Sequence, residues 1–325
     1  MSDYAIRLER TGGPERLARV DAAPRAPGAG ELIFRTTAVG LNYIDAYHRS
    51  GLYPVPLPAV LGGESVGTVE AVGEGVQGFA PGDRVGSWGP TLGAYATTRT
   101  LPAAECVRLP GDLDDETLAA TLLKGATVEF LVERCAKVQA GWPVLVWAAA
   151  GGVGHLAVQW LHAIGAEVIG VAGGADKAAS VKAAGAAHVI DHRSEDVAER
   201  VKAITGGKGV PVVLDGVGKA SWEASLKSVA RRGLIASYGN ASGPVEGVAL
   251  GALARAGSIF VTRPTLFDYA STPEERQSTV DRLFAMLRER KLTAEIGQRF
   301  PLADAAEAHR AMEASETHGS TLLLP

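Results

Sequence analysis

The stretch WAAAGGVG (Trp147–Gly154) decides the fold of this chain. It follows the apolar run WPVLV and precedes HLAVQWLHAIGA, in which apolar residues recur at helical spacing. A predicted strand therefore turns into a predicted helix through residues that have small side chains or none. The first N–H groups of a helix have no partner within the helix and carry partial positive charge, so they attract phosphate. The stretch indicates a phosphate-binding corner between a strand and a helix.

The glycines of this corner form a variant of the G-x-G-x-x-G fingerprint of dinucleotide-binding domains. They lack the Cβ that would block a pyrophosphate, and the neighbouring alanines add little bulk. A glycine-rich turn that only packs the helix close to the strand is the alternative interpretation. We predict that the corner binds the pyrophosphate of a dinucleotide through Ala150, Gly151, Gly152, Val153 and Gly154.

From Val144 onward, apolar strand candidates alternate strictly with helical stretches. The predicted strands are VLVWA, EVIGVA, AHVI, PVVLD, LIASY and SIFVT. The predicted helices between them cover residues 152–164, 175–184, 194–204, 220–231 and 248–256. Because the strands are continuous apolar runs, both faces of their sheet should be covered. The pattern predicts an α/β fold with a Rossmann-type, doubly wound parallel sheet.

The chain before about Leu123 has a different texture, with period-2 alternation between glycine and proline boundaries, which predicts a β-rich domain. Its predicted strands include residues 31–40, 64–73, 81–86 and 93–98. After Pro264, an amphipathic helix over 273–291, a second helix over 301–314 and a final strand over 319–325 are predicted. We expect this tail to fold back onto the β-rich domain.

Composition limits the class of protein. The 325 residues are enough for two domains, and a net charge of −4 gives no basic surface for nucleic acid. No apolar run approaches the roughly 18–20 residues of a membrane span, and the charged N-terminus shows no secretory signal. Two cysteines, Cys106 and Cys135, cannot staple a chain of this size. We expect a cytoplasmic protein that binds neither nucleic acid nor membrane.

The end of the second predicted strand distinguishes between cofactors. An NAD site usually has an acidic residue there that binds the ribose 2′-hydroxyl, whereas this strand ends in Gly173 and Gly174, followed by Lys177. Lys177, with Arg193 after the next strand, would attract a 2′-phosphate. Asp176 is the competing signal, although it can instead cap the first turn of its helix. The pattern favours NADPH.

Further motifs extend over nearly the whole chain: GLNYIDAYHRSGLYP (40–54), GGESVGTVEAVG (62–73), LKGATV (123–128), AAAGGVG (148–154), DGVG (215–218), RRGLIASYGNASG (231–243), VTRP (261–264) and GSTLLLP (319–325). Together they resemble the quinone oxidoreductases of the zinc-independent medium-chain dehydrogenase/reductase superfamily, which are related to ζ-crystallin. The resemblance implies a GroES-like catalytic domain over residues 1–124, completed by residues 264–325. It also implies a Rossmann NADP-binding domain over residues 125–263, with the cofactor in the cleft between the two domains.

The same resemblance assigns the remaining cofactor contacts. The adenosine phosphate would lie near Gly173, Gly174, Lys177 and His192, and His192 stands where the family commonly has tyrosine. A histidine can still stack on adenine or donate to phosphate. The nicotinamide end would lie near Asn42, Thr127, Tyr238, Gly239, Asn240, Pro264, Thr265 and Leu266.

The sequence also predicts that no metal is used. Zinc-dependent relatives carry a G-H-E triplet, and this chain has Gly62–Gly63–Glu64, without the histidine. The catalytic cysteine is missing from LNYIDAY (41–47), and a structural zinc lobe would need four clustered cysteines. Quinones and conjugated carbonyls accept hydride more easily than ketones because they delocalise the charge, so the absence of a Lewis acid favours these substrates over alcohols.

Hydride transfer needs donor and acceptor in register and a group that stabilises charge on the acceptor oxygen. We predict that Asn42 and Tyr47 orient the nicotinamide and the acceptor carbonyl, and that Asp45 fixes their loop. Asp45 as a plain turn cap, and tyrosines that only pack, are the alternatives. Tyr53 and Thr127 are predicted to contact the substrate.

Three functions remain open from the sequence. The first is an NADPH-dependent quinone reductase, and the second is an enoyl or enone reductase that acts on alkenals or acyl thioesters. The third is a nucleotide-binding or crystallin-like protein without turnover. The last predicted strand, SIFVT, would lie at a sheet edge, and an apolar edge is a liability unless it is paired. We therefore expect a homodimer joined through this strand.

Overall fold

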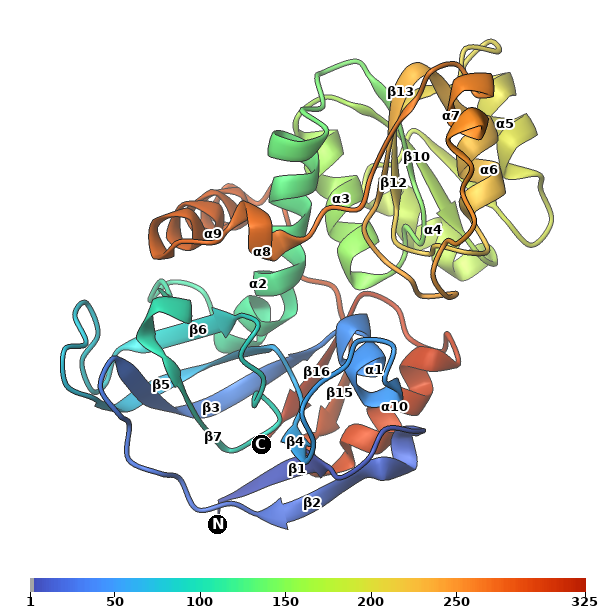
Figure 1. The fold of residues 1–325 in the computed structure, drawn as a ribbon. Helices are drawn as coiled ribbons and strands as arrows, with labels where there is room; N and C mark the ends of the chain where they lie inside the picture. Colours follow the sequence, from blue (N-terminus) through green and yellow to red (C-terminus); the bar gives the residue numbers. More distant parts are fainter. Residues whose placement is uncertain (1–2) are drawn as a thin grey trace. The chain divides into compact units, whose positions relative to one another are not determined.

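The computed structural model describes residues 3–325, which form two compact units. Unit 1 contains the residues up to Ala126 together with Ala270–Phe284 and Ala294–Pro325. Unit 2 contains Thr127–Tyr269 and Ala285–Thr293. Each unit has its own principal sheet (Figure 1). Each also has its own apolar core.

Unit 2 is built on a six-stranded parallel sheet with the order β11-β10-β9-β12-β13-β14. The strands are β9 (Pro143–Val146), β10 (Glu167–Ala172), β11 (His188–Asp191), β12 (Val210–Asp215), β13 (Val229–Ser237) and β14 (Phe260–Thr262). The predicted doubly wound sheet is confirmed. The strand order reverses between β9 and β12, and ligands of such sheets bind outside the carboxyl ends of the strands at this switch point.

Helices cover both faces of this sheet (Figure 1). They are α3 (Gly152–Ala163), α4 (Ala175–Ala183), α5 (Val197–Ile204), α6 (Trp222–Ser228) and α7 (Leu250–Arg255). Apolar side chains of α5, α6 and α7 join one core cluster with Leu145, Ile169 and Ile235 from the strands. On the alternate face, Gly170 of β10 lies against Val181 of α4. The sheet is therefore buried on both faces, as its continuous apolar strands require.

Several predicted helices differ from the structure at their ends, and two of these differences have a clear physical cause. The prediction over residues 194–204 begins too early, because Asp196 caps α5 by accepting the N–H of Glu199. The prediction over residues 220–231 is wrong at its end, because the chain turns extended at Val229. Val229 is β-branched and pairs with Val210 of β12. The residues from Val229 onward therefore belong to a strand, although their spacing predicted a helix.

Unit 1 contains a seven-stranded sheet and a three-stranded sheet. The larger sheet has the order β15-β16-β3-β5-β6-β8, with β7 also paired to β3. Its strands are β3 (Glu31–Leu41), β5 (Glu64–Val72), β6 (Arg84–Trp88), β7 (Thr98–Pro102), β8 (Cys106–Arg108), β15 (Ile296–Pro301) and β16 (Ser320–Leu324). The smaller sheet pairs β1 (Tyr4–Leu8) with β2 (Leu17–Asp21) and β4 (Ala59–Val60). The C-terminal strand β16 pairs antiparallel with β3.

The remaining helices are α1 (Tyr43–Ser50), α2 (Asp115–Glu129), α8 (Leu266–Tyr269), α9 (Pro273–Arg288) and α10 (Ala305–Glu313). α2 continues as a π-helical turn over Phe130–Cys135. In unit 1, α1 and α10 pack on the apolar core through Ala46, Ala308 and Met312. Over residues 3–325, the helices are too short or too polar to cross a membrane.

The predicted strand over residues 93–98 is wrong. Ala96 forms a single antiparallel bridge with Ala5, and β7 begins only at Thr98. The reason is that the backbone of Tyr95 bonds to two different segments. Its N–H donates to the Leu61 carbonyl (2.9 Å), and its carbonyl accepts the N–H of Ile6 (2.8 Å). The segment therefore bridges β1 and the chain before β5 instead of extending one ladder.

Candidate active site

The corner between β9 and α3 is held by backbone bonds. β9 ends at Val146, two residues before the predicted end at Ala148, which has a φ of 50°. This left-handed conformation is uncommon for alanine, and it lets the Ala148 carbonyl accept the N–H of Gly151 (2.9 Å). No side chain caps the N-terminus of α3. The first N–H groups of α3 therefore follow a corner that has no long side chains.

The glycines at this corner are needed for different physical reasons. A Cβ at Gly154 would lie 2.2 Å from the Ala148 carbonyl oxygen, so glycine is needed there to pack α3 against the corner. A Cβ at Gly151 would lie 3.3 Å from the same oxygen, which a small shift could relieve. The expectation that every glycine clears the way for phosphate is therefore incomplete: Gly154 serves helix packing.

The corner between β10 and α4 gathers basic side chains. A Cβ at Gly173 would lie 2.8 Å from His192 Nε2 and 2.9 Å from Arg193 Nε, so glycine lets these two side chains approach the backbone closely. Lys177 lies in the first turn of α4. Asp176, the competing signal, is exposed in the same turn, and α4 has no side-chain cap. The structure thus brings Gly173, His192 and Arg193 together beside α4.

Asp191, at the end of β11, is a residue of this corner that the sequence analysis missed. Its Oδ1 accepts the backbone N–H groups of Gly174 (3.2 Å) and Arg193 (3.0 Å). These bonds, that of Arg193 first, hold the pKa of Asp191 below its ordinary value. Its position directly after an apolar strand was the available signal. The carboxylate orders the loop that carries His192 and Arg193.

The loops after β12 and β13 pack closely. A Cβ at Gly239 would lie 2.2 Å from the Gly216 carbonyl, and a Cβ at Gly216 would meet the Tyr238 ring at 2.9 Å. The buried Asp215 carboxylate anchors the first loop by accepting from Ser221 and Ser225, each at 2.7 Å. Since parallel strands end at one sheet edge, the predicted residues of unit 2 that follow β9, β10, β11, β13 and β14 gather there. Thr127 is buried on α2.

In unit 1, Asn42 begins α1. Asp45 Oδ2 accepts the Asn42 backbone N–H (2.9 Å), and the Asp45 N–H returns a bond to the Asn42 carbonyl (3.0 Å). The Asn42 side-chain amide donates to Glu64 Oε2 (2.8 Å). The bond from the Asn42 N–H to the Asp45 carboxylate is the acidic half of a capping box, in which the third helical residue accepts the N–H of the cap residue. The prediction that Asp45 fixes the loop and the alternative of a turn cap describe the same contact.

Glu64 joins Asn42 to a buried lysine. Its Oε1 accepts the N–H of Leu123 (2.7 Å), and its Oε2 also accepts from Lys124 Nζ (3.4 Å). Glu64 is fully buried and Lys124 is 4% exposed, so the two charges are paired inside unit 1. In the sequence of unit 1, Lys124 is the only lysine. That isolation was a sequence signal for Lys124 that the site prediction did not use.

Asp45 lies at one end of a larger buried network. Burial raises the pKa of its carboxyl to about 7, against the Asn42 N–H and the Tyr95 hydroxyl (3.1 Å), which both lower it. Tyr95 in turn contacts His309 Nε2 (2.9 Å), and His309 Nδ1 accepts from Arg49 Nε (3.3 Å). Tyr95, His309 and Arg49 are site neighbours that the sequence analysis did not find.

Tyr47 and Tyr53 lie together at the two ends of a short segment. Their ring centroids are 5.1 Å apart in an edge-to-face arrangement, and the Tyr53 N–H donates to the Tyr47 carbonyl (3.1 Å). Tyr47 is buried, whereas Tyr53 is partly exposed. The arrangement fits aromatic packing.

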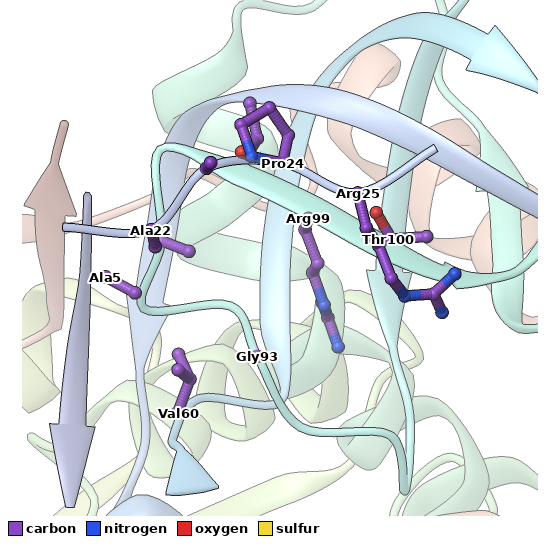
Figure 2. Close-up of a pocket in the computed structure, with 11 residues that line it drawn as sticks. Ala5, Ala22, Pro24, Arg25, Val60, Gly93, Arg99 and Thr100 are labelled. Atoms are coloured by element: carbon purple, nitrogen blue, oxygen red, sulfur yellow. The ribbon is translucent and has the colours of Figure 1, made fainter. Parts of the chain in front are cut away.

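The described part of unit 1 also contains a cavity of about 190 Å³ (Figure 2). Small side chains line it together with Arg25 and Arg99. Among the described residues that line the cavity, none belongs to the predicted site. Arg25 is paired with Glu31 (2.6 Å). The buried Arg99 donates to the Gly63 carbonyl (3.2 Å) and the Ser65 hydroxyl (3.0 Å). Both arginines thus have structural partners.

Across residues 3–325, His, Cys, Asp and Glu side chains form no group of three or more that could hold a metal ion.

Family comparisons define the class of protein. Residues 28–111 match the alcohol dehydrogenase GroES-like domain, and residues 152–285 match the zinc-binding dehydrogenase family. The chain thus has the two-domain organisation of the medium-chain dehydrogenases, which confirms the predicted fold class.

Individual relatives are more specific. A quinone oxidoreductase of Pseudomonas aeruginosa is 48% identical over 98% of this chain and 99% of its own length. The crystal structure of Escherichia coli quinone oxidoreductase complexed with NADPH is 44% identical, has a TM-score of 0.97, and matches 99% of this chain and 100% of that chain. A 2-haloacrylate reductase of a Burkholderia species is 40% identical over 98% of each chain. The chain belongs to the zinc-independent quinone oxidoreductase family of medium-chain dehydrogenases.

Proposed function

We propose that the protein is an NADPH-dependent oxidoreductase that transfers hydride to quinones or related conjugated carbonyl compounds without a metal ion. The observation that carries the proposal is the uncapped N-terminus of α3 after a corner of alanine and glycine. Such helix ends bind phosphate groups. The relative from E. coli was solved with NADPH, which supports the same cofactor here.

The pyrophosphate is assigned to the predicted residues Ala150, Gly151, Gly152, Val153 and Gly154. The 2′-phosphate is assigned to the corner after β10, where Gly173 lets the His192 and Arg193 side chains lie against the backbone. Gly174 and Lys177 complete this subsite. The second strand ends without a carboxylate, and the nearby Asp191 is already occupied by backbone N–H groups. These features support NADPH over NADH.

The nicotinamide end is assigned as the sequence predicts, to Asn42, Thr127, Tyr238, Gly239, Asn240, Pro264, Thr265 and Leu266. The domain division remains part of the proposal: residues 1–124 and 264–325 serve catalysis, and residues 125–263 bind the nucleotide. Support comes from unit 2, where the strands that precede most of these cofactor contacts end at one sheet edge.

When bound, NADPH supplies the hydride. The acceptor takes this hydride and one proton, so a quinone leaves as the hydroquinone. Asn42 and Tyr47 are assigned to orientation, Asp45 to fixing Asn42, and Tyr53 and Thr127 to the substrate. Lys124 is added to this set: its ammonium shares Glu64 with Asn42, so it neutralises the carboxylate that holds the Asn42 side chain.

A second candidate is an enone reductase. It is favoured by the 2-haloacrylate reductase, whose named substrate is also a conjugated acid derivative. The two functions use the same cofactor and the same charge stabilisation at the acceptor. A nucleotide-binding protein without turnover is the non-enzymatic alternative, which the buried Asn42–Glu64–Lys124 cluster argues against because purely structural positions favour apolar residues.

The proposal also includes a homodimer in the cytoplasm. β14 is the last strand of its sheet, and Phe260 and Val261 on it are 60% and 39% exposed. Leu250 of α7 is 81% exposed and Val248 before it is 38% exposed. An apolar edge strand with unpaired backbone groups pairs readily with another strand, and a second copy presents the same edge. The reducing cytoplasm is supported by the two free cysteines.

The test is steady-state oxidation of NADPH and NADH against naphthoquinone, benzoquinone, an enone, a 2-haloacrylate and crotonyl thioester, with protein dialysed against a chelator. The proposal expects the highest kcat/KM with NADPH and a quinone. Preference for the haloacrylate or enone would select the second candidate. Cofactor binding without oxidation of NADPH by any acceptor would select the non-enzymatic alternative.

A further inference from the structure

Four buried polar side chains of unit 1 form a continuous hydrogen-bonded series. Asp45 contacts the Tyr95 hydroxyl at 3.1 Å, Tyr95 contacts His309 Nε2 at 2.9 Å, and His309 Nδ1 contacts Arg49 Nε at 3.3 Å. Asp45, Tyr95 and His309 are fully buried and Arg49 is 1% exposed. They come from α1, the segment before β7, and α10.

The direction of every bond in the series is fixed by chemistry. An arginine only donates, so His309 Nδ1 must accept and carries no proton. Burial, and then the charge of Arg49, lowers the pKa of His309 to about 3, so its ring is neutral and its proton is on Nε2. His309 therefore donates to Tyr95, and Tyr95 donates to Asp45. All three bonds run from Arg49 toward Asp45.

Both ends of the series are anchored. At the outer end, Arg49 also donates to the Gly12 carbonyl (2.8 Å) and pairs with Glu313, which is 38% exposed. At the inner end, Asp45 Oδ2 also accepts the Asn42 backbone N–H, and Oδ1 is buried without a hydrogen-bond partner. A buried carboxylate with one unsatisfied oxygen is costly, and apolar residues would stabilise the fold at least as well.

We propose that Tyr95, His309 and Arg49 are positioning residues for the hydride transfer: they form a one-way relay of hydrogen-bond donors that extends the field of Arg49 to the Asp45 carboxylate and so fixes Asn42 at the start of α1. The inference rests on the proposed function, which assigns Asn42 to the reacting end of the cofactor. None of the three relay residues needs to touch substrate, because each acts through Asp45.

The relay has a pH signature. With the pKa of Asp45 at about 7, protonation near neutral pH replaces a charge-assisted bond to the Asn42 N–H by a weaker neutral one. kcat/KM should therefore fall on the acid side of this value. The Tyr95 donor lowers the pKa of Asp45, so its removal should raise the midpoint. The charged and titratable groups around Asp45 that share its field are Tyr95, Glu64, Lys124, Arg99, Arg49, His309 and Glu313.

The first test is the pH profile of kcat/KM for NADPH-dependent naphthoquinone reduction by Tyr95→Phe. The acid-side midpoint should rise by about one pH unit, with activity below the midpoint about tenfold lower and NADPH affinity above the midpoint unchanged. Tyr43→Phe is the matched control, because Tyr43 lies on α1 with Asp45 and its hydroxyl donates to the Met312 carbonyl, outside the series. Its midpoint should equal that of the wild type.

The second test compares two variants of His309. His309→Gln keeps an acceptor for Arg49 and a donor for Tyr95, whereas His309→Leu keeps neither. The glutamine variant should retain the wild-type midpoint and the leucine variant should shift like Tyr95→Phe. If Tyr95→Phe fails to fold, the two His309 variants test the relay on their own. Lower activity at every pH with an unmoved midpoint, or equal shifts in both His309 variants, would overturn the relay. An inactive wild type would instead overturn the proposed function.

Discussion

At the residue scale, Asp45 has a carboxyl group whose proton affinity is set by burial. Its folded pKa of about 7 lies above the ordinary value of 3.8, so between these values the folded state holds a proton that the unfolded state has released. The free energy of unfolding therefore falls as pH rises through this window, by up to about 1.4 kcal/mol per pH unit from this group.

The variant Asp45→Asn removes this titration while keeping an oxygen that can accept the Asn42 N–H. Its melting temperature, relative to that of the wild type, should rise as pH increases from about 4 to about 7 and then level off. Thermal unfolding followed by circular dichroism across this range measures the difference. A difference in melting temperature between Asp45→Asn and the wild type that is the same at all pH values would show that Asp45 titrates normally in the folded protein.

The partners of Asp45 illustrate what a sequence hides at this scale. Asp45 and Tyr95 are 50 positions apart, Tyr95 and His309 are 214 apart, and Arg49 and His309 are 260 apart. No local pattern joins such residues, because the fold alone brings them together. The glycine corner between β9 and α3 was predictable because its residues follow one another in a single strand-to-helix connection.

At the element scale, the β9–α3 corner depends on a close approach. In Gly154→Ala, the new Cβ would lie 2.2 Å from the Ala148 carbonyl oxygen, so α3 must move away from the corner. We expect a melting temperature lower by several degrees and at least tenfold weaker NADPH binding. Gly151→Ala, with 3.3 Å to the same oxygen, is the matched control and should lose clearly less stability. Differential scanning calorimetry and NADPH titration compare the two, and equal melting temperatures would contradict the packing role.

The β10–α4 corner should determine the choice of cofactor. Lys177→Ala and Arg193→Ala each remove a positive charge beside Gly173 and Gly174, so the KM for NADPH should rise about tenfold, as expected for loss of a charge-assisted contact to phosphate. The KM for NADH should change little, because NADH has no 2′-phosphate. Equal increases in KM for NADPH and NADH would show that the 2′-phosphate does not bind at this corner.

The errors in predicted elements have a common physical cause. Helical spacing extended the predicted helix to residue 231, but Val229 pairs with Val210 and belongs to β13. Alternation predicted a strand over residues 93–98, but Tyr95 binds Leu61 and Ile6 at once. In both places a tertiary partner overrides the local pattern. By contrast, β10, β11 and β12 of unit 2, whose apolar runs are continuous, lie within one residue of their predicted bounds.

At the scale of the whole molecule, the exposed edge of unit 2 predicts association. Phe260→Lys places a charge on β14, where an approaching strand of a second copy would bury it. The variant should sediment as a monomer at micromolar concentration, whereas the wild type should sediment as a dimer. Unchanged NADPH binding would show that unit 2 is still folded. A monomeric wild type, or a dimeric Phe260→Lys, would contradict association through this edge.

The most direct test of the central claim, metal-free hydride transfer from NADPH to a conjugated acceptor, is rapid mixing of chelator-dialysed protein with NADPH and naphthoquinone. The account predicts saturable NADPH oxidation that survives dialysis and slows several-fold when deuterium replaces the transferred hydrogen. Oxidation no faster than in buffer alone, or activity that dialysis removes and zinc restores, would contradict it.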